Sequence, residues 1–292
     1  MFEWLEKQLP KLVLAPSFLA ILFFVYGFIG WTAWISLTKS RLLPKYDIIG
    51  LLQYERLFAA PRWDVAFSNL FIFGFLFILT SMLLGLLLAV MLDQKIRTEG
   101  IIRTIYLYPM ALSLIVTGTA WKWILNPGLG LEAMIRGWGW ENFSFDWLVD
   151  PNMAIYTVVI AGVWQASGFV MALFLAGLRS VDEEIIKAAQ VDGVPTWRIY
   201  LSIILPSMAA VFLSAFIVLS HLAIKSFDLV IALTGGGPGY ATDLPATYMY
   251  TMAFSRGDIG HAASSAMIMM AVVFAIVVPY LYSELRVKNG QI

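Results

Sequence analysis

Long apolar segments without acidic or basic side chains alternate with polar segments along the whole chain. The apolar runs cover residues 12–38, 65–92, 104–121, 151–178, 199–224 and 262–283. Each run is long enough for a helix that crosses a hydrocarbon core about 30 Å thick. The pattern therefore predicts an all-α integral membrane protein with six transmembrane helices in a single transmembrane domain over residues 1–292.

The composition agrees with this prediction. Hydrophobic residues make up 60% of the chain and charged residues 13%, and the mean hydropathy of +0.81 is outside the range of soluble globular domains. Nineteen basic residues balance 19 acidic residues, so no nucleic-acid partner is indicated. The absence of cysteine excludes disulfides and thiol catalysis. The first run is too long for the apolar region of a signal peptide, so we expect it to be retained as a membrane span.

A polar segment between the fourth and fifth runs, DEEIIKAAQVDGVPTWRIYLSIILP, predicts two short helices joined by a turn. Ser180 followed by Glu183 fits a capping box for the first helix. Asp192-Gly193 ends that helix, and Pro195 suits the first position of the second, where a missing N–H costs nothing. The sequence therefore predicts a helix-turn-helix over residues 180–206 that projects from the membrane.

The spacing of Ala188-Ala189, Gly193 and Ile203-x-Leu205-Pro206 resembles the EAA motif in the coupling loop of permease subunits of ABC importers. This resemblance implies the type I ABC importer permease fold, with the helix-turn-helix in the cytosol and docked on an ATPase. It assigns the ATPase-coupling role to Glu183, Glu184, Lys187, Ala188, Ala189, Asp192, Gly193 and Pro206. The sequence departs from the family at Lys187, where a Glu is usual, and Glu183 or Glu184 is the alternative source of the acid.

A glycine-rich string, LTGGGPG at residues 233–239, cannot continue a helix. Together with Phe227-Asp228 and the later YTMAF, it resembles the segment between the last two spans of carbohydrate importer permeases, the branch for maltose, glucose and glycerol phosphate. The stretches TAWKWILNPGLGLE and FDWLVDPNMAIYTVVIAGVWQ look most like glucose/mannose and α-glucoside permeases. We expect the string to form an outer gate loop that contains Thr234, Gly235, Gly236, Gly237 and Pro238.

Polar residues inside the spans are costly unless they face the protein interior or a water-filled cavity. In relatives of the maltose type, the third, fourth and fifth spans hold the substrate, which implies a pathway lined by Ser113, Thr117, Trp164, Gln165, Phe169, Ser220, His221 and Lys225. Each has a structural alternative. Serine and threonine hydroxyls can bond to a carbonyl one turn earlier, and Gln165 can bond a neighbouring helix. Lys225 can reach the membrane interface or pair with Asp228, and His221 can be a packed, hydrogen-bonded core residue.

The resemblance implies a permease subunit of an ATP-driven sugar importer in the cell inner membrane, multi-pass with cytosolic termini. No Walker A motif is present, so the chain is expected to be no enzyme and to bind no cofactor, with ATP and Mg held by a partner ATPase. The implied partners are a second homologous permease, two ATP-binding subunits, an external sugar-binding protein and membrane lipid. The alternatives are a glycerol-phosphate-type ABC permease and a secondary transporter, although the six runs contain no carboxylate for ion coupling.

Overall fold

The structure is a computed structural model that describes residues 2–94 and 96–288. In these residues the regular structure is helical, apart from an isolated bridge between Thr38 and Ile48. The backbone divides into two compact units, a smaller one of residues 1–61 and 248–270 and a larger one of residues 62–247 and 271–292. An all-α fold therefore agrees with the sequence, while the prediction of one transmembrane domain stays a prediction.

The smaller unit contains the N-terminal helix, which is continuous from α1 through a π-helical turn to α2. Its elements are α1 (Phe2–Ile21), η1 (Leu22–Tyr26), α2 (Gly27–Ser36), α3 (Leu52–Phe58), the end of α14 (Pro245–Tyr250), η3 (Thr251–Ser255) and the first part of α15 (Ile259–Lys288). The apolar side chains along residues 13–34 are largely exposed. A buried hydrogen bond of 2.7 Å joins the Tyr248 hydroxyl to Nε2 of His261 in this unit.

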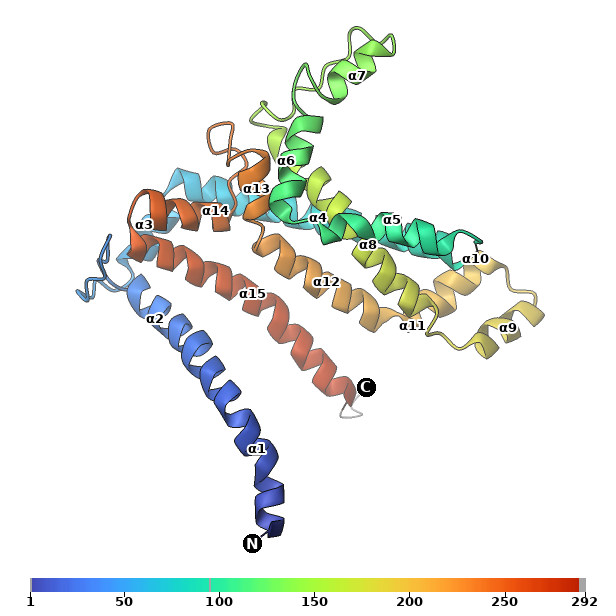
Figure 1. The fold of residues 1–292 in the computed structure, drawn as a ribbon, viewed down its shortest axis with the longest axis horizontal. Coiled ribbons are helices and arrows are strands. Elements are labelled where there is room, and N and C mark those ends of the chain that lie inside the picture. The colour runs from blue at the N-terminus through green and yellow to red at the C-terminus, as the bar shows by residue number, and fades with distance from the viewer. Residues whose placement is uncertain (1, 95, 289–292) are drawn as a thin grey trace. The chain divides into compact units, whose positions relative to one another are not determined.

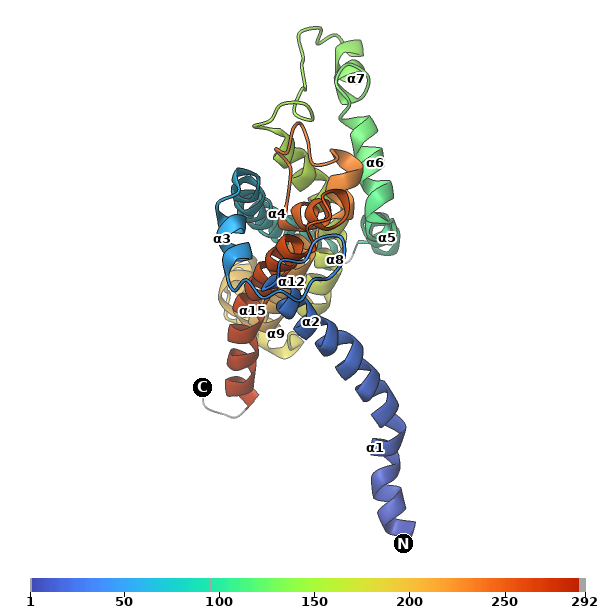
Figure 2. The same cartoon turned by 90° about the vertical axis from the view of Figure 1, so that its left-hand side faces the viewer.

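The larger unit is built around α8 (Ala154–Leu178), whose side chains are mostly buried. The helices α5 (Glu99–Ala111), α6 (Leu114–Ile124), α12 (Ala209–Ile224) and α13 (Asp228–Leu233) all pack on it. The unit also contains α4 (Pro61–Asp93), α7 (Leu131–Gly137), α9 (Glu183–Val191), α10 (Thr196–Ile199), η2 (Tyr200–Ile204) and α11 (Leu205–Ser207). Figures 1 and 2 show α7 and the α9–α10 hairpin at opposite ends of this unit.

Four helices of the described residues are long and apolar enough to cross a membrane: Val13–Ser36, Pro61–Asp93, Ala154–Leu178 and Ile259–Tyr282. Two bent pairs raise the number to six if each pair is one crossing. They are Glu99–Ala111 with Leu114–Ile124, bent by 101°, and Thr196–Ser207 with Ala209–Ile224, bent by 66°. The structure thus differs from straight helices over residues 104–121 and 199–224.

Both bends follow a proline, which has no N–H for the helical hydrogen bond. Pro109 lies in the last turn of α5, and Leu112 then adopts an extended backbone with φ −80° and ψ 145°. Ser113 begins the next helix, since its Oγ accepts a hydrogen bond of 3.3 Å from the backbone N–H of Val116. In the second pair, Met208 follows Pro206 and has φ −92° and ψ 10°.

Glycines allow the neighbouring helices to approach α8 closely, as small residues do in membrane bundles. A Cβ added at Gly168 would lie 1.7 Å from the backbone oxygen of Tyr106 in α5. A Cβ at Gly85 in α4 would lie 2.6 Å from Cγ1 of Val170 in α8. The contact with α5 is therefore one of backbone against backbone, which no side-chain rotation relieves.

We predict that Gly168→Ala destabilises the folded protein by about 1–3 kcal/mol, because the added methyl group forces α5 away from α8. The measurement is the thermal unfolding midpoint of the purified full chain in detergent. Gly100→Ala is the matched control, since it adds a methyl group to α5 where no atom lies within 4 Å. Equal midpoints for the two variants would contradict the close packing of α5 on α8.

Candidate functional site

The α9–α10 hairpin begins at a capped helix end. Asp182 has an extended backbone, and its Oδ1 accepts a hydrogen bond of 2.9 Å from the backbone N–H of Glu184. The predicted capping box at Ser180 is wrong, because the Ser180 hydroxyl donates to the carbonyl of Gly177 at 2.7 Å and so belongs to the end of α8. Asp182 lies directly before the first turn, where its carboxylate also suits the positive end of the helix dipole.

The turn after α9 is a Schellman motif. The backbone N–H of Val194 donates to the carbonyl of Ala189 at 3.1 Å, and the backbone N–H of Gly193 donates to the carbonyl of Gln190 at 3.0 Å. Gly193 has φ +75°, and a Cβ there would meet no atom within 4 Å. Glycine is therefore favoured by the left-handed backbone and not by a lack of space. The predicted break at Asp192-Gly193 is confirmed. The prediction that Pro195 takes the first helical position is wrong by one residue, because Pro195 has an extended backbone with ψ 143° and is the N-cap of α10.

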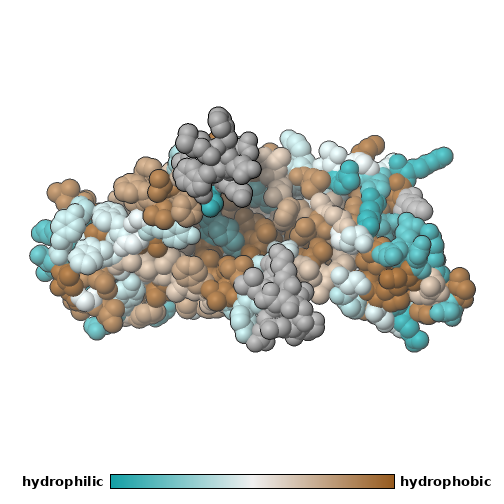
Figure 3. Space-filling view, turned by 90° about the horizontal axis from the view of Figure 1, so that it is seen from below, coloured by the Kyte–Doolittle hydropathy of each residue, from teal (hydrophilic) through white to brown (hydrophobic). Residues whose placement is uncertain are grey.

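The hairpin turns a mixed surface outward. Ala189 is buried, whereas Ala188 and the large apolar side chains of Ile185, Val191 and Trp197 are exposed. Figure 3 shows hydrophilic side chains gathered beside hydrophobic ones at the end of the larger unit that carries this hairpin. A surface of this kind suits contact with another protein.

Lys187 lies on the exposed side of α9 and forms an ion pair with Glu183, one helical turn earlier, at 2.8 Å between Nζ and Oε2. The hydrogen bond that Lys187 donates to the Glu183 carboxylate raises the pKa of Lys187, so the ammonium stays protonated at neutral pH. Glu184 is also exposed, and no ion pair joins it to another part of the chain that the structure describes.

Polar side chains join four elements where the hairpin meets the helices. Arg179, directly after α8, forms an ion pair of 2.9 Å with Glu99 at the start of α5 and lies 3.9 Å from Asp93 at the end of α4. The hydroxyl of Tyr200, at the start of η2, donates to Asp93 at 2.9 Å. Both ends of the hairpin are thereby connected to the junction of α4 and α5. Pro206 lies further on, exposed in α11.

A cavity of about 200 Å³ lies in the larger unit among α4, α5, α6, α8 and the end of α12 with α13. In the part of the chain that the structure describes, its lining combines aromatic rings with few polar groups and contains no charged residue: Phe73, Phe77, Met110, Leu114, Gly162, Gln165, Ala166, Phe169, Leu222, Ser226 and Leu229. Of the predicted pathway residues, Gln165 and Phe169 line it. Trp164, next to Gln165, is partly exposed, and its ring contacts that of Trp121 edge to face, with 5.9 Å between the ring centroids.

Gln165 connects the cavity to the bend between α5 and α6. Its Nε2 donates a hydrogen bond of 2.9 Å to the carbonyl of Leu112, the extended residue at that bend. Its Oε1 is buried and has no partner among the described residues. The helix-neighbour alternative for Gln165 is therefore confirmed for one end of the amide, and the other end retains hydrogen-bonding capacity.

The other predicted pathway residues lie apart from the cavity lining. Ser113 caps α6, and the hydroxyl of Ser220 donates to the carbonyl of Phe216 one turn earlier at 2.7 Å. Thr117 is fully buried, and its Oγ1 has no partner among the described residues. His221 and Lys225 are exposed, and Lys225 is the C-cap of α12. Ser226 is the hydroxyl that does line the cavity, and sequence reasoning missed it.

The glycine-rich loop after α13 is folded on itself. Gly235 and Gly236 have φ +67° and +90°, which glycine adopts without strain. The hydroxyls of Thr234 and Thr242 lie 2.6 Å apart, and that of Thr242 also donates to the carbonyl of Gly237, which precedes Pro238, at 3.1 Å. The predicted loop is thus an ordered turn with its own hydrogen bonds.

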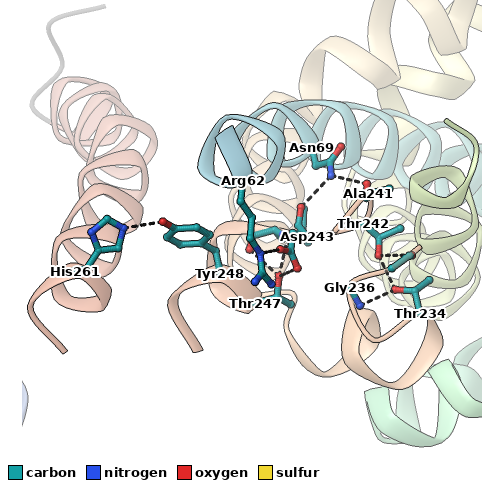
Figure 4. A network of polar contacts seen from close by, with 12 residues as sticks. Arg62, Asn69, Thr234, Gly236, Ala241, Thr242, Asp243, Thr247, Tyr248 and His261 are labelled. Atoms are coloured by element: carbon teal, nitrogen blue, oxygen red, sulfur yellow. Dashed lines mark hydrogen bonds and ion pairs between the residues drawn. The ribbon is translucent and has the colours of Figure 1, made fainter. Parts of the chain in front are cut away.

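A buried ion pair holds this loop to α4 (Figure 4). Nε of Arg62 lies 2.5 Å from Oδ2 of Asp243, and Nδ2 of Asn69 donates to the carbonyls of Ala241 and Asp243 at 2.8 and 3.0 Å. Sequence reasoning missed the roles of Arg62 and Asp243, because they are 181 positions apart and no local pattern joins them. No group of side chains suited to a metal ion occurs in the described residues.

Comparison with known proteins agrees with this geometry. Residues 81–285 match the family described as binding-protein-dependent transport system inner membrane component. A probable ABC transporter permease protein of Pyrococcus horikoshii is 39% identical over 281 residues, which cover 95% of this chain and 96% of that protein. A xylose/arabinose import permease protein of Haloferax volcanii is 35% identical over 266 residues, which cover 90% of this chain and 83% of that protein.

The fold is also similar to a solved structure. A chain in the crystal structure of a bacterial ABC transporter involved in the import of the acidic polysaccharide alginate superposes with a TM-score of 0.84 over 98% of each chain, at 21% identity. That similarity supports the type I importer permease fold. With most of its length matched and a relative at 39% identity, the chain belongs to the family of binding-protein-dependent transport system inner membrane components.

Proposed function

We propose that this chain is the permease subunit of an ATP-driven importer of a neutral sugar. It forms the translocation pathway with a second homologous permease, receives sugar from an external binding protein and docks on two ATPases. The observation that carries the proposal is the α9–α10 hairpin. Its Schellman turn at Gly193 and its exposed apolar side chains form a projecting knob at the positions of the EAA motif.

Coupling follows from how the hairpin is attached. Ile185, Val191 and Trp197 offer apolar surface for a groove on the ATPase. Glu183 is paired with Lys187, whereas Glu184 has no ion pair within the described residues and is the acid available for a basic residue of that partner. When the ATPases close, displacement of the hairpin is passed through Arg179 and Tyr200 to Asp93 and Glu99, and so to α4 and α5.

The orientation follows from the same assignment. With the hairpin and both termini in the cytosol, α7 and the glycine-rich loop face the outside, since α7 and the hairpin occupy opposite ends of the larger unit (Figures 1 and 2). Nearly equal numbers of basic residues on the two sides give no independent orientation from charge. The proposal therefore rests on the hairpin for its orientation as well.

The cavity beside Gln165 supports a neutral substrate. Phe73, Phe77 and Phe169 offer aromatic faces, and Gln165 and Ser226 offer hydrogen bonds, which is the combination that sugar rings use. Among the residues that the structure describes, no cationic side chain lines the cavity to balance a phosphate, which disfavours the glycerol-phosphate alternative. The pentose importer permease among the relatives also supports a sugar. Glucose is one of the sugars suggested by the sequence resemblance to glucose/mannose and α-glucoside permeases.

The proposed function is tested by uptake and ATP hydrolysis in vesicles that contain the complete transporter and its binding protein. We expect a neutral mono- or disaccharide from a panel that includes glucose, xylose, maltose and trehalose to stimulate both. Glycerol phosphate is the charged member of the panel. If glycerol phosphate is the only compound that stimulates uptake and ATP hydrolysis, the substrate is an anion and not a neutral sugar. If no compound of the panel stimulates them, the proposal of a sugar substrate is refuted.

We predict that Gly193→Val uncouples ATP hydrolysis from uptake. A β-branched residue in the left-handed region costs about 1–2 kcal/mol, so the hairpin refolds locally and no longer fits its partner. Uptake per ATP hydrolysed is the measurement. Gly193→Asn is the control, because asparagine tolerates this conformation better than other non-glycine residues. Full coupling in the valine variant would refute the role of the hairpin.

We predict that Gln165→Leu changes the relative uptake rates of different sugars and lowers the thermal unfolding midpoint. The variant removes an amide from the cavity and leaves the Leu112 carbonyl without its partner, at a cost of about 1–3 kcal/mol. The control is Thr119→Val, which removes a hydroxyl that bonds back to the carbonyl of Ile115 in its own helix. A lower midpoint with unchanged relative uptake would make Gln165 a purely structural residue.

A further inference from the structure

Asp243 is a carboxylate buried in the protein, with 1% of its surface exposed. A buried charge is tolerated only where a counterion and hydrogen bonds compensate for the lost water. Arg62 supplies the counterion at 2.5 Å, and the hydroxyl of Thr247 donates to Oδ1 at 3.1 Å. The Arg62 side chain is itself three-quarters buried. Removal of one partner of this pair would therefore leave an uncompensated charge in a buried site and destabilise the local structure.

A second contact from α4 reinforces the first. Asn69 follows Arg62 by two helical turns and so lies on the same face of α4. Its amide group donates to two backbone carbonyls, those of Ala241 and Asp243. Figure 4 shows both side chains directed from α4 toward this segment. The outer end of α4 thus holds the side chain of Asp243 by charge and its backbone by hydrogen bonds.

The glycine-rich loop packs directly on the carboxylate of Asp243. A Cβ added at Gly236 would lie 2.7 Å from Oδ1 of Asp243, so the loop touches the carboxylate closely. The backbone N–H of Thr242 donates to the carbonyl of Gly236 at 3.1 Å. The Thr242 hydroxyl forms a hydrogen bond with the Thr234 hydroxyl. A continuous chain of contacts therefore runs from α4 through Asp243 to the loop.

We propose that Arg62 is a positioning residue for sugar transfer at the outer face: by its ion pair with Asp243, it fixes the glycine-rich loop to the outer end of α4, so that helix and loop move as one body. This inference rests on the proposed function for its orientation. α4 ends at Asp93, beside the hairpin contacts, and begins at Pro61, directly before Arg62. A single helix therefore links the coupling end of the larger unit to the loop.

The first experiment measures the mobility of the loop itself. The chain has no native cysteine, so a nitroxide label on Tyr240→Cys, an exposed loop position, reports on the loop alone. In the full chain in lipid nanodiscs, Arg62→Met should raise the ratio of mobile to immobile label about tenfold, because it leaves a buried carboxylate unpaired. Asp64→Asn, which changes an exposed charge on the same helix, should leave the ratio unchanged.

Two further variants separate the ion pair from general loosening. Arg62→Met combined with Asp243→Asn removes both charges, so we expect less mobility than in Arg62→Met alone. A label on Trp197→Cys in the distant hairpin should keep its mobility in all of these proteins. An unchanged Tyr240 label in Arg62→Met, or an equal rise at both label positions, would overturn the proposal.

The second experiment measures transfer of the sugar. In vesicles with the complete transporter, Arg62→Met should raise about tenfold the concentration of sugar-loaded binding protein that gives half-maximal uptake. The rate of ATP hydrolysis measured without binding protein should stay unchanged. Unchanged half-maximal concentration together with a mobile loop would refute the transfer role. A mobile loop in a chain that transports no sugar would refute the proposed function and leave the attachment of the loop by Arg62 intact.

Discussion

Backbone N–H and C=O groups inside a membrane must find their partners within the protein, and the larger unit depends on this constraint at the bend between α5 and α6. Leu112 is extended, and its carbonyl accepts no backbone N–H among the described residues. Gln165 of α8 donates to that carbonyl at 2.9 Å, and Ser113 restarts the helix by capping it. A bend of 101° can therefore persist in an apolar setting. The same bend brings Met110 and Leu114 to the cavity wall.

Charged groups are concentrated at the two ends of α4. At one end Asp93 meets Arg179 and Tyr200, and at the other Arg62 meets Asp243. The environments differ, since Arg179 is nearly half-exposed and Asp243 is fully buried. An exposed pair contributes little to stability and can exchange partners, whereas a buried pair resists separation. This difference suits a flexible connection at the coupling end and a firm one at the loop.

Local features of the chain were predictable because they depend on contacts within a few residues. The membrane spans follow from uninterrupted apolar runs, and the break at Gly193 follows from glycine at the end of a short amphipathic helix. The error at Ser180 is also local. The two candidate caps, Ser180 and Asp182, lie two residues apart, and the end of α8 decides which of them is used. The Ser180 hydroxyl donates to the carbonyl of Gly177 at the end of α8, so Asp182 caps α9.

The sequence by itself determined the all-α membrane class, the two-helix hairpin with its break at Gly193 and the end of the helix at the glycine-rich loop. These depend on apolar run length and on hydrogen bonds between near neighbours. Only the tertiary structure decided which polar residues line the cavity, so that Gln165 and Ser226 are included while His221 and Lys225 are not. It also decided that Arg62 meets Asp243, 181 positions away. The physical reason is that such contacts depend on bend angles and on backbone approach at Gly168, which leave no periodic trace in the chain.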